Sequence, residues 1–286
     1  MTYQEAYQKA TGELKAAGIP EPESDSWILL EHVTGMTRTR YYVDGFERMP
    51  KNEEDRFFEL VSCRKTRIPV QHLTGVQEFM GYEFAVNEHV LVPRQDTEIL
   101  VEEAEKRLLL MKKENPVKVL DMCTGSGCIL LSVALERKLS KGIGVDISGK
   151  ALAVAKANQE ALAPENVTLI QSDLFENAGK YLMEQSVDIV VSNPPYICTE
   201  VIDSLSEEVR LHDPVLALDG HEDGLYFYRK ITKQAKSFLK PGGRLFYEIG
   251  YDQSAAVEAL LCKEGYTQVS TVKDLAGLDR VVMGRL

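Results

Sequence analysis

Apolar residues recur at helical spacing through the first part of the chain. The pattern predicts one amphipathic helix from about Tyr3 to Leu14, a second over residues 23–33, and a third that starts near Asn52. Gly18 and Pro20 end the first of these segments. Three helices of this kind before residue 70 predict a small helical bundle.

The pattern changes to strand-like alternation after residue 75. Residues 77–86 are typical of a β-hairpin that turns near Gly81. We therefore predict a linker over residues 71–92. After Pro93 the helical pattern returns over residues 97–111.

Strands and helices then alternate to the end of the chain. Strands are expected near residues 117–122, 142–147, 166–171, 187–192 and 243–248, and helices near 126–138, 149–162, 224–239 and 252–264. Two late strands, near 266–273 and 278–284, are expected to form an antiparallel hairpin at one edge. This alternation predicts an α/β fold with a doubly wound, mostly parallel seven-stranded sheet. The predicted division is 1–70 for the helical domain, 71–92 for the linker and 93–286 for the α/β domain.

Composition narrows the possible functions. The 286 residues carry a formal net charge of -11 and no apolar run of transmembrane length. This acidity argues against general binding to a phosphate backbone, which needs clustered Lys and Arg. The amino terminus lacks a basic start followed by an apolar stretch, so we expect a cytoplasmic protein without membrane contact.

The cysteines and histidines do not indicate a metal site. There are 5 of each, the cysteines are odd in number, and no C-x-x-C or histidine ligand spacing occurs. We expect reduced thiols and no bound metal.

A glycine-rich loop follows the first predicted strand of the α/β domain. It consists of Cys123, Thr124, Gly125, Ser126 and Gly127. Glycines let a backbone approach a ligand closely, although they also serve plain turns from strand to helix. Asp146 ends the next strand, 21 residues after Gly125, where a carboxylate can accept both hydroxyls of a ribose.

A dinucleotide does not fit this loop well. Its fingerprint requires a small residue where this chain has Leu130. After the following strand, Asp173 is placed to accept the amine of an adenine and Leu174 to pack on its ring. Asp173 alternatively caps the following turn, a common use of aspartate. These residues together predict a ligand with a ribose and an adenine.

The tetrapeptide Asn193-Pro194-Pro195-Tyr196 directly follows the predicted strand 187–192. Open α/β sheets bind ligands at the carboxyl ends of their strands. Two prolines fix the turn and remove two donors, so the turn presents carbonyl groups that only accept. The Asn193 oxygen and a carbonyl near Pro194 suit an incoming NH2 group, and Tyr196 offers a face for stacking. A tight loop with an Asn turn residue is the simpler alternative.

The order of these motifs resembles class I S-adenosylmethionine-dependent methyltransferases of the Asn-Pro-Pro-Tyr branch. Further similarity, in residues 92–98, 213–220 and 223–225 together with Gly75 and Phe79, is to the HemK/PrmC family of peptide chain release factor glutamine methyltransferases. The similarity extends over nearly the whole chain. It implies a Rossmann-like fold. Two positions depart from the family pattern: Gln95 replaces a proline, and Cys123 replaces a glycine.

The resemblance implies both the reaction and its partners. S-adenosylmethionine would be the methyl donor, leaving S-adenosylhomocysteine, and the target would be the glutamine of the Gly-Gly-Gln motif in release factors. Asn193, Pro194 and Tyr196 would be catalytic, and Pro195 would join them in binding the substrate. The cofactor would contact residues 123–127, Asp146, Asp173, Leu174 and Asn193. The helical domain would dock the factor, and a monomer is expected.

Three alternatives remain open at this point. In the first, the methylated group is a glutamine of a ribosomal protein. In the second, it is an exocyclic amine of a nucleic-acid base. In the third, the chain is not an enzyme and only binds a translation factor. The acidic charge and the lack of a Lys/Arg-rich recognition segment count against the nucleic acid.

Overall fold

The computed structural model describes residues 1–111, 117–137 and 139–286, and divides into two compact units. Unit 1 consists of Met1–Val76 together with Ser206–His212, and unit 2 of Gln77–Leu205 and Asp213–Leu286. No helix in the described ranges is both long and apolar enough to cross a membrane. The last position of the helix expected over 126–138 lies outside the described residues.

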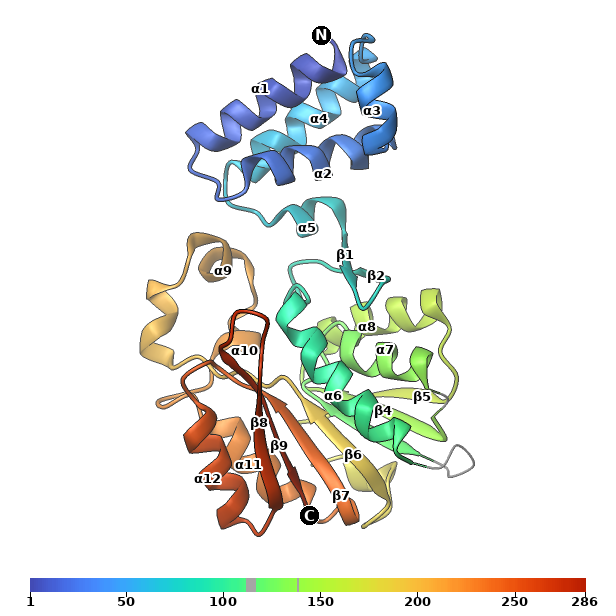
Figure 1. Cartoon of the computed structure of the whole chain (residues 1–286), viewed down its shortest axis with the longest axis vertical. Helices are drawn as coiled ribbons and strands as arrows, with labels where there is room; N and C mark the ends of the chain where they lie inside the picture. The colour runs from blue at the N-terminus through green and yellow to red at the C-terminus, as the bar shows by residue number, and fades with distance from the viewer. Residues whose placement is uncertain (112–116, 138) are drawn as a thin grey trace. The chain divides into compact units, whose positions relative to one another are not determined.

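Unit 1 is a helical bundle (Figure 1). Its helices are α1 (Tyr3–Ala16), α2 (Pro22–Thr34), α3 (Arg38–Asp44), α4 (Lys51–Arg64) and α5 (Val70–Thr74), joined by α9 (Glu207–His212). The three predicted helices are confirmed as α1, α2 and α4, whose apolar faces share one core that includes Leu14, Leu30 and Phe57. At the start of α1, Thr2 and Glu5 form a capping box. The short helices α3, α5 and α9 were not predicted.

The predicted hairpin is present at the start of unit 2. Strands β1 (Val76–Phe79) and β2 (Tyr82–Ala85) form a two-stranded sheet of their own. Met80 and Gly81 connect them with φ angles of 52° and 75°. Two successive positive φ angles are typical of the tightest hairpin turns, which match the twist of the paired strands.

The main sheet has seven strands in the order β5-β4-β3-β6-β7-β9-β8, which confirms the predicted fold class. The strands are β3 (Lys118–Met122), β4 (Lys141–Asp146), β5 (Val167–Gln171), β6 (Val187–Ser192), β7 (Leu239–Glu248), β8 (Thr267–Lys273) and β9 (Asp279–Arg285). β3 to β7 pair in parallel, and β9 and β8 complete the predicted antiparallel edge.

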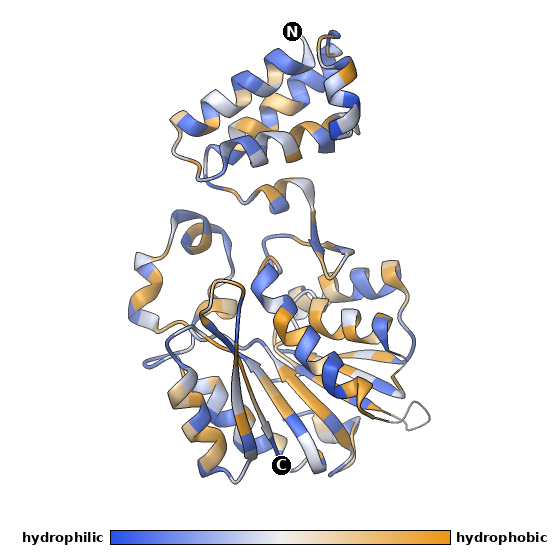
Figure 2. Ribbon diagram, viewed as in Figure 1, coloured by the Kyte–Doolittle hydropathy of each residue, from blue (hydrophilic) through white to orange (hydrophobic). Residues whose placement is uncertain are grey.

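Helices cover both faces of this sheet (Figure 1). The longer helices of unit 2 are α6 (Glu98–Leu109), α7 (Cys128–Glu136), α8 (Gly149–Leu162), α11 (Tyr226–Ala235) and α12 (Ser254–Lys263). The unit also contains the short α10 (Val215–Leu218) and the 3-10 turns η1 (Gln95–Thr97), η2 (Ala178–Lys180) and η3 (Thr199–Ser204). Alternate residues of β3 point to opposite faces: Leu120 packs in the core that includes α11 and α12, and Val119 in the core that includes α6 and α7. Figure 2 shows apolar residues concentrated in the central strands.

Candidate active site

Strand register brings the sequence-predicted site residues to one edge of the sheet. Met122 pairs with Ser192 on β6 and with Val145 on β4. The next residues along the chain, among them Cys123 and Asn193, therefore leave the sheet side by side at its carboxyl edge. Ser192 reinforces this junction, since its hydroxyl donates to the Met122 carbonyl at 2.6 Å.

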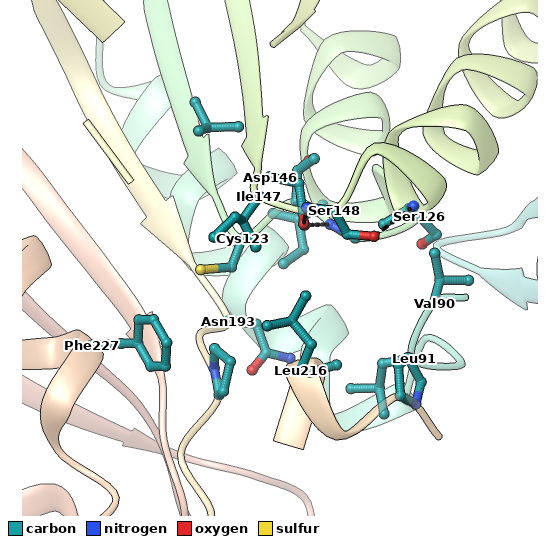
Figure 3. A pocket seen from close by; sticks show the side chains of 18 of the residues that line it. Val90, Leu91, Cys123, Ser126, Asp146, Ile147, Ser148, Asn193, Leu216 and Phe227 are labelled. Atoms are coloured by element: carbon teal, nitrogen blue, oxygen red, sulfur yellow. Dashed lines mark hydrogen bonds between the residues drawn. The ribbon is translucent and has the colours of Figure 1, made fainter. Parts of the chain in front are cut away.

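A cavity of about 310 Å³ opens at this edge, and we call it the strand-end pocket. Its volume lies at the lower end of the range for small-molecule sites, on the order of 300–1,000 Å³. Most of the predicted site residues line it: Cys123, Thr124, Gly125, Ser126, Asp146, Asp173, Leu174, Asn193 and Pro195. Figure 3 shows Cys123, Asp146 and Asn193 around the same cavity.

Three predicted site residues lie outside the pocket lining. Gly127 caps α7 with a φ of 81°. Pro194 is buried, and Tyr196 packs against the core between the sheet and α11. Burial raises the pKa of the Tyr196 hydroxyl. The predicted contact of Tyr196 with a substrate therefore stays a prediction.

Two backbone amides hold the Asp146 carboxylate in place (Figure 3). Gly125 N–H donates to its Oδ2 and Ser148 N–H to its Oδ1, each at 2.9 Å. Burial raises the pKa of Asp146, and these two hydrogen bonds oppose the rise. A carboxylate has about four lone-pair sites, so positions remain that can accept hydroxyl groups of a ligand.

Asp121 lies at the end of β3, just before the glycine loop, and it is fully buried. The Thr124 hydroxyl donates to its Oδ2 at 2.6 Å and so ties the loop to the strand. Burial raises the pKa of Asp121 to about 7. This carboxyl was not predicted as a site residue, because its importance depends on burial.

Cys123 adopts a left-handed conformation, with φ at 62°. Side chains other than glycine are strained in this region, at a cost of roughly 1–3 kcal/mol. The residue types alone do not fix this φ angle, and the structure shows that the position is of the kind that favours glycine. The thiol lies against the core, where burial raises its pKa.

We predict that glycine is better than alanine at position 123. C123G should be more stable than C123A by about 1 kcal/mol, because both lack the thiol and only alanine keeps the left-handed strain. At the exposed helical Cys262 the order should reverse by roughly 0.5 kcal/mol, because glycine disfavours a helix. Urea unfolding of the four variants measures both differences. The same order at both positions would contradict strain at Cys123.

Residues 220–224 and the side chain of Gln253 pack directly on the Asn-Pro-Pro-Tyr turn. Gly220 N–H donates to the Ile197 carbonyl at 2.7 Å, and the Gln253 side chain donates to the Tyr196 carbonyl at 3.0 Å. A Cβ atom at Gly224, whose φ is 69°, would lie 2.4 Å from the same carbonyl oxygen. This close packing gives a structural reason for the glycines at positions 220 and 224, which belong to the family motifs.

Replacing Gly224 by alanine is therefore expected to displace the turn. We expect kcat to fall roughly 10- to 100-fold, since a misplacement of about 1 Å is sufficient for such a loss. Gly265 is the matched control: its φ is 90°, and an added Cβ would meet nothing within 4 Å. Steady-state kinetics of both variants, with melting temperatures, separate displacement from simple strain. Equal kcat values for G224A and G265A would contradict this role of Gly224.

The pocket is also lined by residues outside the predicted set of site residues. The segment before α6 contributes His89, Val90, Leu91, Pro93, Arg94 and Thr97, and the segment that leads into α11 contributes Pro214, Leu216, Ala217, His221, Tyr226 and Phe227. The remaining residues are Cys128 and Ile129 of α7, Ile147, Ser148 and Ala151 after β4, and Val145 and Ser172 at the strand ends. Arg94 donates to Asp213 at 3.2 Å and so joins two of these segments. Both segments carried family motifs, which was the signal available in the sequence.

Comparison with known proteins agrees with this architecture. The family model for the PrmC N-terminal domain matches residues 5–75, and a methyltransferase domain model matches residues 113–274. The release factor glutamine methyltransferase of Caulobacter vibrioides is 43% identical over 285 residues, 99% of this chain and 96% of that protein. The chain belongs to the release factor glutamine methyltransferase family. The resemblance stated from sequence is thus confirmed.

Other members of the release factor glutamine methyltransferase family are also similar along their whole length. The protein of Clostridium acetobutylicum is 40% identical over 284 residues, which cover 99% of this chain and 98% of that protein. The crystal structure of a release-factor-specific protein-(glutamine-N5) methyltransferase from Alicyclobacillus acidocaldarius is 32% identical, with a TM-score of 0.43, and covers 71% of this chain and 98% of that one.

Proposed function

We propose that this chain transfers a methyl group from S-adenosylmethionine to the side-chain amide nitrogen of a glutamine in peptide chain release factors. The observation that carries this proposal is the position of Asn193 in the strand-end pocket together with Asp146 and Asp173. The Asn193 oxygen can accept from the NH2 group of a substrate amide, and it lies beside carboxylates that suit a nucleoside. This arrangement fits a group transfer from a nucleoside cofactor to an amide substrate. The names of the family members support the same reaction.

The residues of the strand-end pocket fit the proposed cofactor. Asp146 keeps acceptor positions for the ribose hydroxyls. Asp173 also lines the pocket, and its carboxylate can accept a hydrogen bond from an adenine amine. Leu174 and Ile147 supply apolar surface for a ring. When bound, S-adenosylmethionine supplies a methyl group on a positively charged sulfur. The glycine loop of residues 123–127 would lie against this ligand.

In the proposed reaction, the protein contributes mainly by positioning. An amide nitrogen is a weak nucleophile because its lone pair is delocalised into the carbonyl. Asn193 Oδ1 and the Pro194 carbonyl accept its two N–H groups and hold the nitrogen in one orientation. Pro195 and Tyr196 keep the turn rigid. The nitrogen would form the new N–CH3 bond as the bond between that methyl carbon and the sulfur breaks, with its electron pair staying on the sulfur of S-adenosylhomocysteine. The nitrogen would then release one proton to solvent and return to a neutral amide.

The finer features of the partner belong to the same proposal. We assign the substrate glutamine to the Gly-Gly-Gln motif, docking of the factor to the helical domain of residues 1–70, and catalysis to residues 93–286, with the hairpin segment 71–92 as linker. We also propose that the enzyme acts as a monomer in the cytoplasm.

Transfer of a labelled methyl group tests the reaction. Purified release factor, its Gly-Gly-Ala variant, a ribosomal protein preparation and duplex DNA are each incubated with the enzyme and labelled S-adenosylmethionine. Label on the wild-type factor alone is expected. Label on DNA or on a ribosomal protein would favour those targets. No label on any substrate, despite cofactor binding by calorimetry, would favour a protein that only binds.

A further inference from the structure

A buried carboxyl lies directly behind Asn193. Ser192 on β6 pairs with Tyr247 on β7, so the next residues, Asn193 and Glu248, also lie next to each other. Glu248 is only 2% exposed and does not line the strand-end pocket. Its backbone is fixed on both sides: it pairs with Val281, and its carbonyl accepts from the Tyr228 hydroxyl at 2.9 Å.

The side chains around Glu248 donate to it. Thr97 and Asn193 are its hydrogen-bonding neighbours, and through these side chains both lower the pKa of the Glu248 carboxyl. Its Oε2 has no hydrogen-bond partner among the described residues. A carboxylate only accepts, so Asn193 contributes its NH2 group to this contact, and the Asn193 oxygen is turned the other way.

An arginine supports the charged form of this carboxyl. Arg280 of β9 is held by Asp274 at 2.9 Å and by Asp96 at 3.3 Å, and its charge lowers the pKa of Glu248. Asp96 raises that pKa. Tyr196, Tyr228 of α11 and Cys128 of α7 also interact electrostatically with Glu248. Burial has the largest effect, and the pKa of Glu248 rises to about 7.

We propose that Glu248 is a positioning residue whose carboxylate orients the Asn193 amide, so that Asn193 Oδ1 faces the substrate nitrogen. The proposal rests on the proposed function for its effect on catalysis. When Glu248 is protonated, its O–H group is a donor that the Asn193 oxygen accepts after the amide rotates. Asn193 then presents NH2 to the substrate NH2, and the acceptor is lost.

This arrangement predicts a pH-dependent kcat. With saturating cofactor and release factor, kcat of the wild type should rise roughly tenfold as pH increases through about 7, as the carboxylate forms. E248Q carries a donor and an acceptor at every pH. This side chain can hold the Asn193 amide in either orientation, so kcat of the variant should not change with pH and should stay below the wild-type value at high pH. An E248Q profile that equals the wild-type profile would overturn the proposal.

Glu105 provides a matched control. Burial and the nearby Glu136 raise its pKa to about 7 as well, but it lies on α6 outside the strand-end pocket. E105Q should keep the wild-type profile. Because Asp121 also has a pKa of about 7, cofactor affinity is measured by calorimetry at each pH and its effect is separated from kcat.

A second readout needs neither substrate nor cofactor. The side-chain NH2 signals of Asn193, identified in NMR spectra by their loss in N193A, should shift with an apparent pKa near 7 in the wild type and not in E248Q. Absence of that shift in the wild type would overturn the proposal. Absence of methyl transfer by the wild type would instead contradict the proposed function, so the two failures are distinguishable.

Discussion

Replacing Asn193 by alanine should abolish methyl transfer while S-adenosylmethionine still binds. The substitution removes the acceptor that we assign to the substrate amide, and one such group typically contributes about 10²- to 10³-fold to kcat. Cofactor contacts assigned to Asp146, Asp173 and the glycine loop remain. Single-turnover rates and calorimetry with the cofactor measure the two effects separately.

Asn177 serves as the control for this substitution. It lies in the same unit but does not line the strand-end pocket, and its side chain bonds to Lys180 and to the Gln171 carbonyl. N177A should keep nearly all of the activity. Activity of N193A within a few-fold of N177A would show that Asn193 does not position the substrate.

Replacing Arg64 by alanine should cause a large loss of stability in unit 1. Arg64 donates to Asp25 at 2.7 Å and to Glu208, and the Arg64 and Asp25 side chains are only 4% and 8% exposed. Burial raises the pKa of Asp25, and Arg64 opposes the rise. Removing Arg64 would leave a buried carboxylate without its partner, at a cost of about 3–5 kcal/mol.

The same substitution should loosen α9. Glu208 and Glu207 form ion pairs with Arg64 and Arg67, and these contacts join Ser206–His212 to the rest of unit 1. Hydrogen exchange of residues 206–212 should therefore accelerate in R64A, and urea unfolding monitored in unit 1 gives the stability change.

Arg56 is the matched control on the same helix. Its ion pair with Glu59 is exposed, so R56A should change stability by less than about 1 kcal/mol. If R64A and R56A unfold alike, the buried ion pairs do not stabilise the unit.

Continuous or periodic apolar patterns made most of the fold predictable. All six residues of β6 are buried, and such a run after a polar loop predicts a central strand without knowledge of its neighbours. β7 was harder, since it begins at Leu239 rather than near residue 243. Pro241 and Gly242 interrupt its pattern, and the pairing of β6 with β7 shifts register between Val187 and Ile189, with the extra residues on β7.

The short helices could not be predicted for a different reason. α3 has no buried residue, and α9 is placed by ion pairs with residues far away in the chain. Nothing in the local pattern of either segment distinguishes it from a loop. For the same reason the sequence did not indicate that Ser206–His212 would cluster with the amino-terminal helices.

The candidate site was predictable where residues directly follow strands. Asp146 and Asn193 could be identified because the carboxyl edge of a parallel sheet is where such folds bind ligands. Glu248 also ends a strand, but its relation to Asn193 depends on the register of β7 against β6. The φ angle of Cys123 likewise depends on the geometry of the loop rather than on its residue types.

Tandem mass spectrometry of a release factor treated with the enzyme and S-adenosylmethionine tests the central claim most directly. The account predicts a mass increase of one methylene group on the side-chain amide of the Gly-Gly-Gln glutamine, absent from factor treated with N193A. An unmodified glutamine at that position, after treatment with folded enzyme that binds the cofactor, would contradict it.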